Sequence, residues 1–480
     1  MDTPNLCNKI NEMIGFIKPF LPLVNCHLVN FITDNLFDKL IPKEIKEEVV
    51  AMKTDELKLL FLNNFKHCNN ECRVSQLGTY FLKTKMMSLS HNGGCISLEK
   101  LKQILSNKSQ DDFKSLPFQG FMSLKKGHEV EIMCALTTFI ANNFKYSHIV
   151  DIGGGKGYLS SMLALEHNLK VLSIDSSIVN NQGAIKRTKK LEKAWKSIKN
   201  KFPQEDKGKN NIYEPIQSIS LKQVTTFVNE TTDLIQIVQR QYPHDTCDKV
   251  MMVGLHTCGT LSPSSLKLFV NNSKHINSLI NVGCCYHLLE EEFEEVSKHW
   301  TREEIGVESF GFPMSNYLQE IKFSLGRNAR MLAAQSIQRI ANEKESNLDL
   351  LFHRVLLEEF LKSKMGYTSL CRFRVGRLAK KTTDFKDYFK KSIKKLELDE
   401  IKISDEELEQ FYVSHLHERE LFEKFFFIRV VLAPVVEGII LLDRQLYLHE
   451  QGIEESYIAQ LFDPYVSPRC HAIIAFNNSK

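Results

Sequence analysis

The chain has 480 residues, of which 43% are hydrophobic and 25% are charged, and its formal net charge is +4. This is the composition of an ordinary globular protein, and the length indicates two or three domains rather than a single core. So small a net charge excludes any argument for nucleic-acid binding from overall charge alone.

The sequence shows no sign of membrane association or secretion. No run reaches the roughly 18 consecutive apolar residues of a membrane span. The start of the chain, Met1 to Asn5, lacks the basic and then apolar order of a secretory signal, and the first 38 residues contain acids but no Arg, unlike a transit peptide. The twelve cysteines are therefore expected to be reduced thiols in a cytoplasmic or nuclear protein.

Hydrophobic periodicity divides the chain into three segments. Residues 1–115 alternate apolar and charged side chains at helical spacing, as in Glu44 to Phe65, and predict a helical N-terminal domain. Strands and helices alternate within residues 116–300, which predicts an α/β fold with a Rossmann-like sheet. Residues 301–480 are mainly helical by period and are expected to pack on the α/β domain or to complete it.

The segment Ile149 to Leu159 (IVDIGGGKGYL) predicts a strand, a tight turn and a helix. Glycine permits positive φ and close approach of the backbone to a ligand, and a helix N-terminus favours negative charge. The order Asp-x-Gly-x-Gly-x-Gly differs from the G-x-G-x-x-G of dinucleotide sites, which disfavours an NAD-dependent oxidoreductase. A carboxylate in the turn suits a ligand with cationic amino and sulfonium groups. The pattern resembles motif I of methyltransferases that use S-adenosylmethionine (SAM). The candidate residues of the turn are Asp151, Gly153, Gly155 and Gly157.

Two further features fit such a ligand. The next predicted strand, Leu169 to Ile174, ends in Asp175, which could accept hydrogen bonds from both ribose hydroxyls. Before the glycine turn, Lys126 and His128 could face the cofactor's carboxylate or a phosphate, although a Lys pair here also suits a solvated helix face.

Two more predicted strand ends carry His and Cys side chains, in GLHTCG and GCCYH. Ligands of open α/β sheets bind beyond the carboxyl ends of the strands. Three interpretations remain open: an acceptor pocket in which the tyrosine contacts the substrate, a zinc site, or structural packing of small thiols. The residues concerned are His256, Cys258, Cys284, Cys285, Tyr286 and His287.

A basic insertion is predicted at about residues 183–212. Between Lys186 and Lys209 there are ten Lys or Arg and three acids. Such a stretch could follow a phosphate backbone, or it could simply be a solvated surface.

Several motifs together resemble the methyltransferase-like twenty-five family, which includes the ribosomal RNA adenine dimethylase domain-containing proteins. The motifs are MSLKKGHEV, VDIGGGKGYLS, GLHTCGTLSPSSL, NVGCCYH, GFPMS, LGRNARMLA, LLDRQLYLHEQG and FDPYVSPR, between Pro117 and Arg469. The resemblance implies a class I methyltransferase sheet with helical extensions at both ends. It also implies that the aspartates and glycines named above hold SAM.

The resemblance leaves the substrate open. Adenine dimethylation is associated with an Asn/Asp-Pro-Pro-Tyr/Phe tetrad, where this chain has Gly254 to Thr257 (GLHT). The His-x-Cys-Gly and Cys-Cys-x-His motifs are similar instead to transfer-RNA ribose 2′-O-methyltransferases of the thirteen type. A ribose hydroxyl requires a base or strong positioning, which His256 or His287 could provide.

The expected function is therefore SAM-dependent methyl transfer to RNA. The acceptor side is assigned to His256, Cys258, Tyr286 and His287, and no metal ligand is assigned. Methylation of a protein side chain and a non-catalytic SAM-binding regulator are the alternatives. A protein partner remains unidentified.

Overall fold

The structure is a computed structural model that describes residues 1–66, 75–106, 122–199, 220–293, 310–342, 346–366, 375–376, 378, 382–398 and 400–477. The predicted basic insertion therefore lies outside the described residues from position 200 onward, as does the start of the family resemblance at Pro117.

The chain forms two compact units, neither of which is continuous in sequence. Unit 1 comprises Met1–Ile10, Gly93–Ser324 and Gly438–Lys480, and unit 2 comprises Asn11–Asn92 and Leu325–Glu437. These units differ from the three consecutive segments that periodicity predicts, because strands near the C-terminus belong to the same sheet as those of the central segment.

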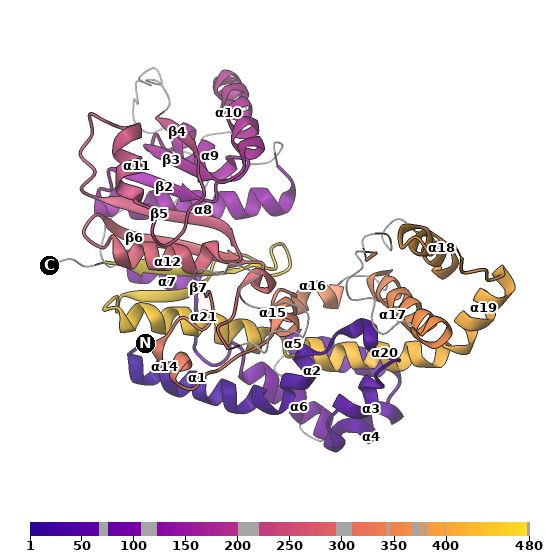
Figure 1. Cartoon of the computed structure of the whole chain (residues 1–480). Helices are drawn as coiled ribbons and strands as arrows, with labels where there is room; N and C mark the ends of the chain where they lie inside the picture. The colour runs from indigo at the N-terminus through magenta and orange to yellow at the C-terminus, as the bar shows by residue number, and fades with distance from the viewer. Residues whose placement is uncertain are drawn as a thin grey trace. The chain divides into compact units, whose positions relative to one another are not determined.

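Unit 1 contains the sheet (Figure 1). Its strands are β1 (Ile96–Ser97), β2 (His148–Ile152), β3 (Val171–Asp175), β4 (Leu221–Thr225), β5 (Val250–Cys258), β6 (Ile276–Cys284), β7 (Ser456–Gln460) and β8 (His471–Phe476). Its helices are α7 (Leu98–Ser106), α8 (Leu124–Phe144), α9 (Tyr158–Glu166), α10 (Ile178–Lys199), α11 (Leu234–Gln241), α12 (Leu261–Asn271), the short η4 (Tyr286–Leu288) and α14 (Asn316–Glu320). Helices α1 (Thr3–Ile17) and α21 (Ala433–Glu450) each contribute one part to unit 1 and one part to unit 2.

The described strands form one eight-stranded sheet in the order β1-β7-β8-β6-β5-β2-β3-β4. Strands β2 to β6 pair in parallel, whereas β8 runs antiparallel to both β6 and β7. The chain passes from β2 to β3 on one side and later adds β5 on the other side of β2. This is the kind of switch point beyond which α/β proteins bind ligands. The predicted α/β fold class is confirmed.

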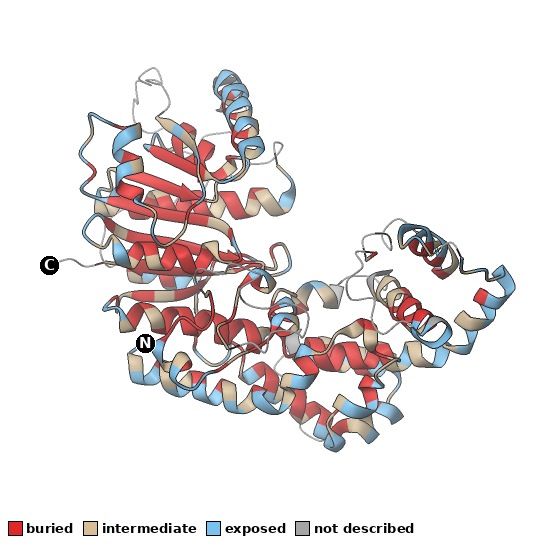
Figure 2. Ribbon diagram, in the orientation of Figure 1, coloured by how far each residue is buried: buried red, intermediate tan, exposed pale blue. Residues whose placement is uncertain are grey.

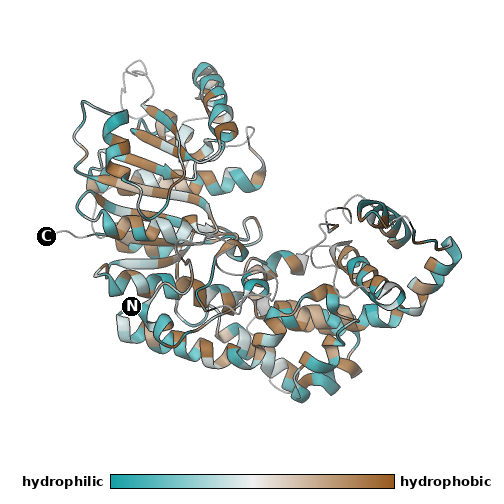
Figure 3. Cartoon of the chain, viewed as in Figure 1, coloured by the Kyte–Doolittle hydropathy of each residue, from teal (hydrophilic) through white to brown (hydrophobic). Residues whose placement is uncertain are grey.

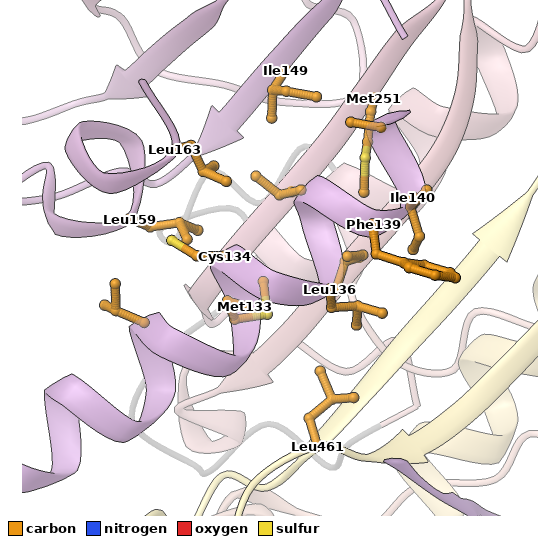
Figure 4. Close-up of a cluster of buried hydrophobic side chains, with 14 of the residues drawn as sticks. Met133, Cys134, Leu136, Phe139, Ile140, Ile149, Leu159, Leu163, Met251 and Leu461 are labelled. Atoms are coloured by element: carbon orange, nitrogen blue, oxygen red, sulfur yellow. The ribbon is translucent and has the colours of Figure 1, made fainter. Parts of the chain in front are cut away.

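The sheet forms because its central strands are covered on both faces. All five residues of β2 are buried, and the strands stand out as buried and apolar in Figures 2 and 3. On one face, α8 and α9 pack against alternate residues of β5, as Leu136, Leu163 and Met251 show in Figure 4. Parallel strands buried on both sides are expected to be rich in aliphatic residues, which accounts for the predicted apolar runs. This packing holds the carboxyl ends of β2 and β5 in place.

Unit 2 is helical throughout its named elements. These are η1 (Lys18–Phe20), α2 (Leu21–Asn25), η2 (Leu28–Asn30), α3 (Leu36–Leu40), α4 (Lys43–Ala51), α5 (Thr54–Lys66), α6 (Gln76–Met86), α15 (Arg327–Ala333), α16 (Ile337–Asn342), α17 (Ser346–Met365), α18 (Phe385–Lys395), α19 (Asp405–Ser414) and α20 (Leu416–Val430). Aromatic pairs join its distant segments: the ring centroids of Phe31 and Phe422 lie 5.2 Å apart, and those of Phe61 and Phe427 lie 5.0 Å apart.

One helical run has the length and composition of a membrane span. It covers Leu416–Glu450, which includes α20 and α21, and 94% of its most apolar window is buried inside the protein. The apolar side chains of this run are thus already covered by the protein's own residues.

Candidate functional site

A cavity of about 190 Å³ lies where the switch point places it, beside the turn that follows β2. The backbone of Gly153 to Gly155 forms one side, and Lys126 and Glu129 of α8 form another. Asp151, Lys156, Tyr158 and His256 also contribute polar groups, so the lining comes from four elements: α8, β2 with its turn, α9 and β5.

The turn depends on glycine. Gly153, Gly155 and Gly157 have φ values of +72°, +56° and +68°, in the left-handed region that other residues rarely adopt. A Cβ at Gly154 would overlap the hydroxyl oxygen of Ser173, so a side chain is excluded there for lack of space. The predicted strand, turn and helix are therefore all present.

Asp151 is a buried carboxyl group in the lining of the cavity, with 1% of its surface exposed. The Ser160 hydroxyl donates a hydrogen bond to its Oδ2. Burial raises the pKa of Asp151 to about 6, and repulsion from Asp175 acts in the same direction. A cationic ligand group beside this carboxylate would offset both effects.

Asp175 lies at the end of β3, on the other side of the glycine turn. Its Oδ2 accepts a hydrogen bond of 2.9 Å from the Gly155 N–H, and its Oδ1 accepts one of 2.8 Å from the Ser177 N–H. The Asn180 amide also donates to Oδ1, over 3.2 Å. These bonds fix the carboxylate at the strand end, outside the lining of the cavity.

A buried acid and a histidine are paired in the lining. Glu129 Oε2 lies 3.0 Å from His256 Nε2, and the Ser467 hydroxyl donates to Glu129 Oε1 over 2.5 Å. Burial acts to raise the pKa of Glu129, but the hydrogen bonds and charges around it, His256 first among them, leave that pKa below its usual value. Glu129 is therefore an ionised, acceptor-only group, and His256 Nε2 carries the shared proton.

The backbone directs His256 toward the cavity. Its φ is +68°, although it is not glycine, and the pairing of β5 with β6 shifts register between Leu255 and Thr257. A bulge of this kind inserts a residue and redirects its side chain, and such strain gathers at functional sites. The side chain of His256 keeps 36% of its surface exposed, so it faces the pocket rather than the core.

Three thiols gather two residues beyond the bulge at His256. Cys258 pairs with Cys284 across β5 and β6, and their Sγ atoms lie 3.0 Å apart. The hydrogen bond from Cys284 lowers the pKa of the Cys258 thiol to about 6, whereas the same contact raises the pKa of Cys284. Together with Cys285, all three Sγ atoms lie within 4.8 Å of one another.

Tyr286 and His287 follow the thiols in η4 but differ in exposure. Tyr286 is 1% exposed, and the guanidinium groups of Arg444 and Arg469 lie 5.6 Å and 5.8 Å from the centre of its ring. Its ring is thus enclosed by protein, which favours a packing role over contact with an acceptor. His287 is half-buried and lies outside the lining of the cavity.

Lys126 and His128 lie in different surroundings, although the sequence predicts that both face the cofactor. Lys126 lines the cavity, with its ammonium 4.2 Å from the centre of the Tyr158 ring. The His128 ring instead accepts a 3.0 Å hydrogen bond from the Asp463 N–H. On a helix, residues two apart point in different directions, which explains why His128 is not in the cavity lining.

Comparison with known proteins agrees with this geometry. Residues 125–292 match a family model described as a methyltransferase domain. The human protein named "Probable methyltransferase-like protein 25" is 29% identical to this chain, over 100% of the chain and 98% of the relative. The mouse protein of the same name is also 29% identical, over 99% of the chain and 97% of the relative. The chain is thus similar over its full length to methyltransferase-like protein 25.

The sheet of this chain has the mixed, mostly parallel arrangement that the sequence predicts for a class I methyltransferase, with helical regions on both sides of the matched domain in sequence. A crystal structure of coclaurine N-methyltransferase with N-methylheliamine and SAH aligns with 52% of this chain and 61% of that chain. Its sequence identity to this chain is 13%, and its TM-score of 0.20 is too low to bear on the site.

Of the predicted residues, five line the cavity: Lys126, Asp151, Gly153, Gly155 and His256. Glu129 and Ser467 were not singled out, yet they orient His256. Both stand inside motifs that carry the family resemblance, MSLKKGHEV and FDPYVSPR. In the sequence, the signal that points to Glu129 is an acid close to two lysines in the helix that precedes the glycine turn.

Proposed function

We propose that the chain is a SAM-dependent methyltransferase that transfers the methyl group to a hydroxyl oxygen of RNA. The observation that carries this proposal is the hydrogen-bonded pair of Glu129 and His256 in the lining of the cavity, opposite the glycine turn.

The residues present fit SAM. Asp151 is a buried carboxylate whose raised pKa calls for a cation, and the amino group of SAM is one. The ammonium group of Lys126, in the lining of the cavity, suits the carboxylate of the methionine part. Asp175, fixed beyond the turn, suits the ribose hydroxyls. A cavity of 190 Å³ is smaller than the roughly 300–1,000 Å³ of small-molecule sites, so it suits the methionine part alone.

The paired acid and histidine supply what a hydroxyl acceptor requires. Glu129 holds Nε2 of His256 in the protonated form, which leaves Nδ1 as the ring nitrogen that can accept a proton. A neutral hydroxyl is a poor nucleophile until a base removes its proton during attack. SAM, when bound, supplies the methyl group from its sulfonium. His256 takes the hydroxyl proton, and Glu129 stabilises the imidazolium that results.

The charge of α10 supports RNA over protein as the substrate. Lys186, Lys189, Lys190 and Lys193 are exposed along this helix, which belongs to the same unit as the cavity (Figure 2). Arg187 adds a guanidinium 4.2 Å from the centre of the Tyr158 ring at the cavity lining. These four exposed lysines outnumber the one acid among them, Glu192, and such an excess of cations suits a phosphate backbone.

The test is incorporation of a labelled methyl group from SAM into total RNA and total protein by the purified full chain. The proposal expects label in RNA, located on ribose after digestion to nucleosides, and its loss in His256→Ala. His244→Ala, which alters an exposed histidine of the same unit, is the matched control. Label in protein instead would favour the alternative substrate. SAM binding without any transfer would favour the non-catalytic regulator.

A further inference from the structure

Cys258, Cys284 and Cys285 form a cluster of thiols that methyl transfer to a hydroxyl does not require. Their three Sγ atoms lie within 4.8 Å of one another. Among the described residues of the chain, this is the group of His, Cys, Asp and Glu side chains whose ligand atoms are close enough to share one metal ion. A cluster of three thiols is too concentrated to be explained by the use of cysteine as a small apolar residue.

The fold builds this cluster from two neighbouring parallel strands. Cys258 and Cys284 are register partners at the carboxyl ends of β5 and β6, and the Gly259 N–H donates to the Cys284 carbonyl over 3.1 Å. This hydrogen bond continues the strand pairing past the last partners. The first two thiols are therefore held side by side by backbone hydrogen bonds.

The third thiol joins them through a strained backbone. Cys285 has a φ of +53°, which places a residue with a side chain in the left-handed region. Successive residues of an extended strand point to opposite faces, so a regular backbone would direct Cys285 away from Cys284. The left-handed conformation brings both to the same place. Strain of this kind persists where a function or the surroundings maintain it.

We propose that Cys258, Cys284 and Cys285 bind one Zn²⁺ ion as three thiolates, with a fourth position left for water or an atom of the acceptor. Three thiolates at about 2.3 Å from one zinc ion are about 3.8 Å apart. The Sγ atoms of Cys258 and Cys284 lie 3.0 Å apart and the whole set lies within 4.8 Å, so small rotations of the side chains suffice. Zinc binding goes beyond the proposed methyl transfer and does not rest on it, whereas binding of an acceptor atom at the fourth position does.

Burial and charge in the cluster suit an open zinc site. Cys284 is buried and Cys285 is half-buried, whereas Cys258 is exposed, so the cluster is covered on one side and accessible on the other. Three thiolates and Zn²⁺ leave a net charge of −1. The Arg469 guanidinium, whose charge acts on Cys285, offsets part of it. Zinc sites with three protein ligands and one free position are typical of catalysis, whereas structural sites have four.

The site lies on the acceptor side of the methyltransferase domain. Cys258 is two residues beyond His256, which lines the cavity, and both follow the apolar part of β5. The thiol cluster and the cavity therefore lie at the same edge of the sheet. An acceptor oxygen bound to the zinc would lose its proton more readily, because zinc lowers the pKa of a bound water or hydroxyl group.

The experiment measures zinc in the full chain purified without chelator, by inductively coupled plasma mass spectrometry. The wild type is expected to carry about one equivalent that depends on the three thiols. Cys258→Ser, Cys284→Ser and Cys285→Ser should each lower the zinc content severalfold. Because Cys258 is exposed, its replacement leaves no cavity in the core and tests the ligand without unfolding the domain. Cys95→Ser, at a half-buried cysteine of the same unit, is the matched control and should retain the wild-type content.

Spectroscopy provides a second readout that needs no enzymatic activity. Cobalt substituted for zinc should show intense thiolate charge-transfer bands, which weaken in Cys258→Ser but not in Cys95→Ser. Three results would overturn the proposal: a zinc content that none of the three substitutions lowers, cobalt spectra without thiolate bands, or a Cys258–Cys284 disulfide in the protein as isolated under reducing conditions. Loss of methyl transfer with zinc retained would bear on the proposed function alone.

Discussion

Glu129 of α8 and His256 of β5 lie 127 positions apart in the chain, yet the carboxylate and the imidazole share a hydrogen bond of 3.0 Å in the lining of one cavity. The acid is 1% exposed, and burying its charge is costly unless it has a hydrogen-bond partner. The histidine is such a partner, and the acid in turn orients the histidine. A buried acid that fixes the protonated nitrogen of a histidine leaves the other nitrogen ready to act as a base.

The first prediction concerns this pair. Glu129→Gln should reduce the rate of methyl transfer by roughly 10²–10⁴-fold, because the histidine loses the carboxylate that fixes its tautomer and stabilises its cation. Affinity for SAM should change little, and calorimetry combined with initial rates would separate the two effects. His244→Ala should change neither quantity. An unchanged rate in Glu129→Gln would exclude the paired histidine as the base.

The second prediction concerns pH. Burial raises the pKa of Asp151 from 3.8 to about 6, so the folded protein holds this proton more tightly than the unfolded chain does. The free energy of unfolding should therefore fall as the pH rises from about 4 to about 6. Binding of the SAM ammonium needs the ionised carboxylate, so affinity should rise over the same range and level off above it. Titration calorimetry at several pH values would check this, and Asp151→Asn should abolish the pH dependence.

A third prediction concerns Ser160, whose side chain is hydrogen-bonded to the Asp151 carboxylate. The Ser160 hydroxyl donates to Asp151 and lowers its pKa. Ser160→Ala should therefore shift the midpoint of the SAM-affinity profile to higher pH, and should destabilise the fold by about 1–3 kcal/mol through the lost buried hydrogen bond. Denaturant unfolding would measure the second effect. A midpoint that moves to lower pH would contradict the assignment of the profile to Asp151.

The fourth prediction concerns RNA. Replacing Lys186, Lys189, Lys190 and Lys193 with Ala should weaken RNA binding and reduce the slope of log affinity against log salt by about 3. Fluorescence anisotropy with a single-stranded RNA at several salt concentrations would measure this. The matched control replaces Lys390, Lys391, Lys394 and Lys395, four exposed lysines of α18 in the other unit. Equal losses in both variants would point to non-specific attraction rather than a surface on α10.

The fifth prediction tests whether Tyr286 packs in the core or contacts the acceptor. Because the ring is 1% exposed and has two guanidinium groups within 5.8 Å of its centre, Tyr286→Ala should cost about 3–5 kcal/mol of stability, as for other large buried aromatics. Tyr286→Phe keeps the ring and should retain most of the activity. Loss of activity in a stable Tyr286→Phe protein would instead indicate that the tyrosine hydroxyl contacts the acceptor.

The sequence alone predicts those parts of the site that follow one another along the chain. The strand before Asp151, the glycine turn and the helix after it are all encoded within Ile149 to Leu159, and Asp175 ends the next strand. Local pattern suffices here, because strand burial and turn conformation each depend on neighbouring residues.

Features that depend on distant contacts are not predicted. Helix α8 is buried on most sides, so its apolar pattern gives no indication that Glu129 is turned toward a partner far along the chain. The bulge at His256 arises from pairing with β6, which no local pattern shows. Strand β7 is a short run in a segment that otherwise has helical periodicity, and its place in the sheet is set by antiparallel pairing with β8.

The position of β8 has a consequence for the order in which the protein can fold. This strand lies between β6 and β7 in the interior of the sheet, yet it comprises His471 to Phe476, the last described strand of the chain. During synthesis, the edge of β6 stays unpaired until these residues leave the ribosome, and an open parallel edge is prone to aggregation. A fragment that stops at residue 292, where the methyltransferase family match ends, would keep this edge permanently open. It would also lack Ser467, so Glu129 would lose one of its hydrogen bonds. Active protein is therefore expected only from chains synthesised through to their last strand.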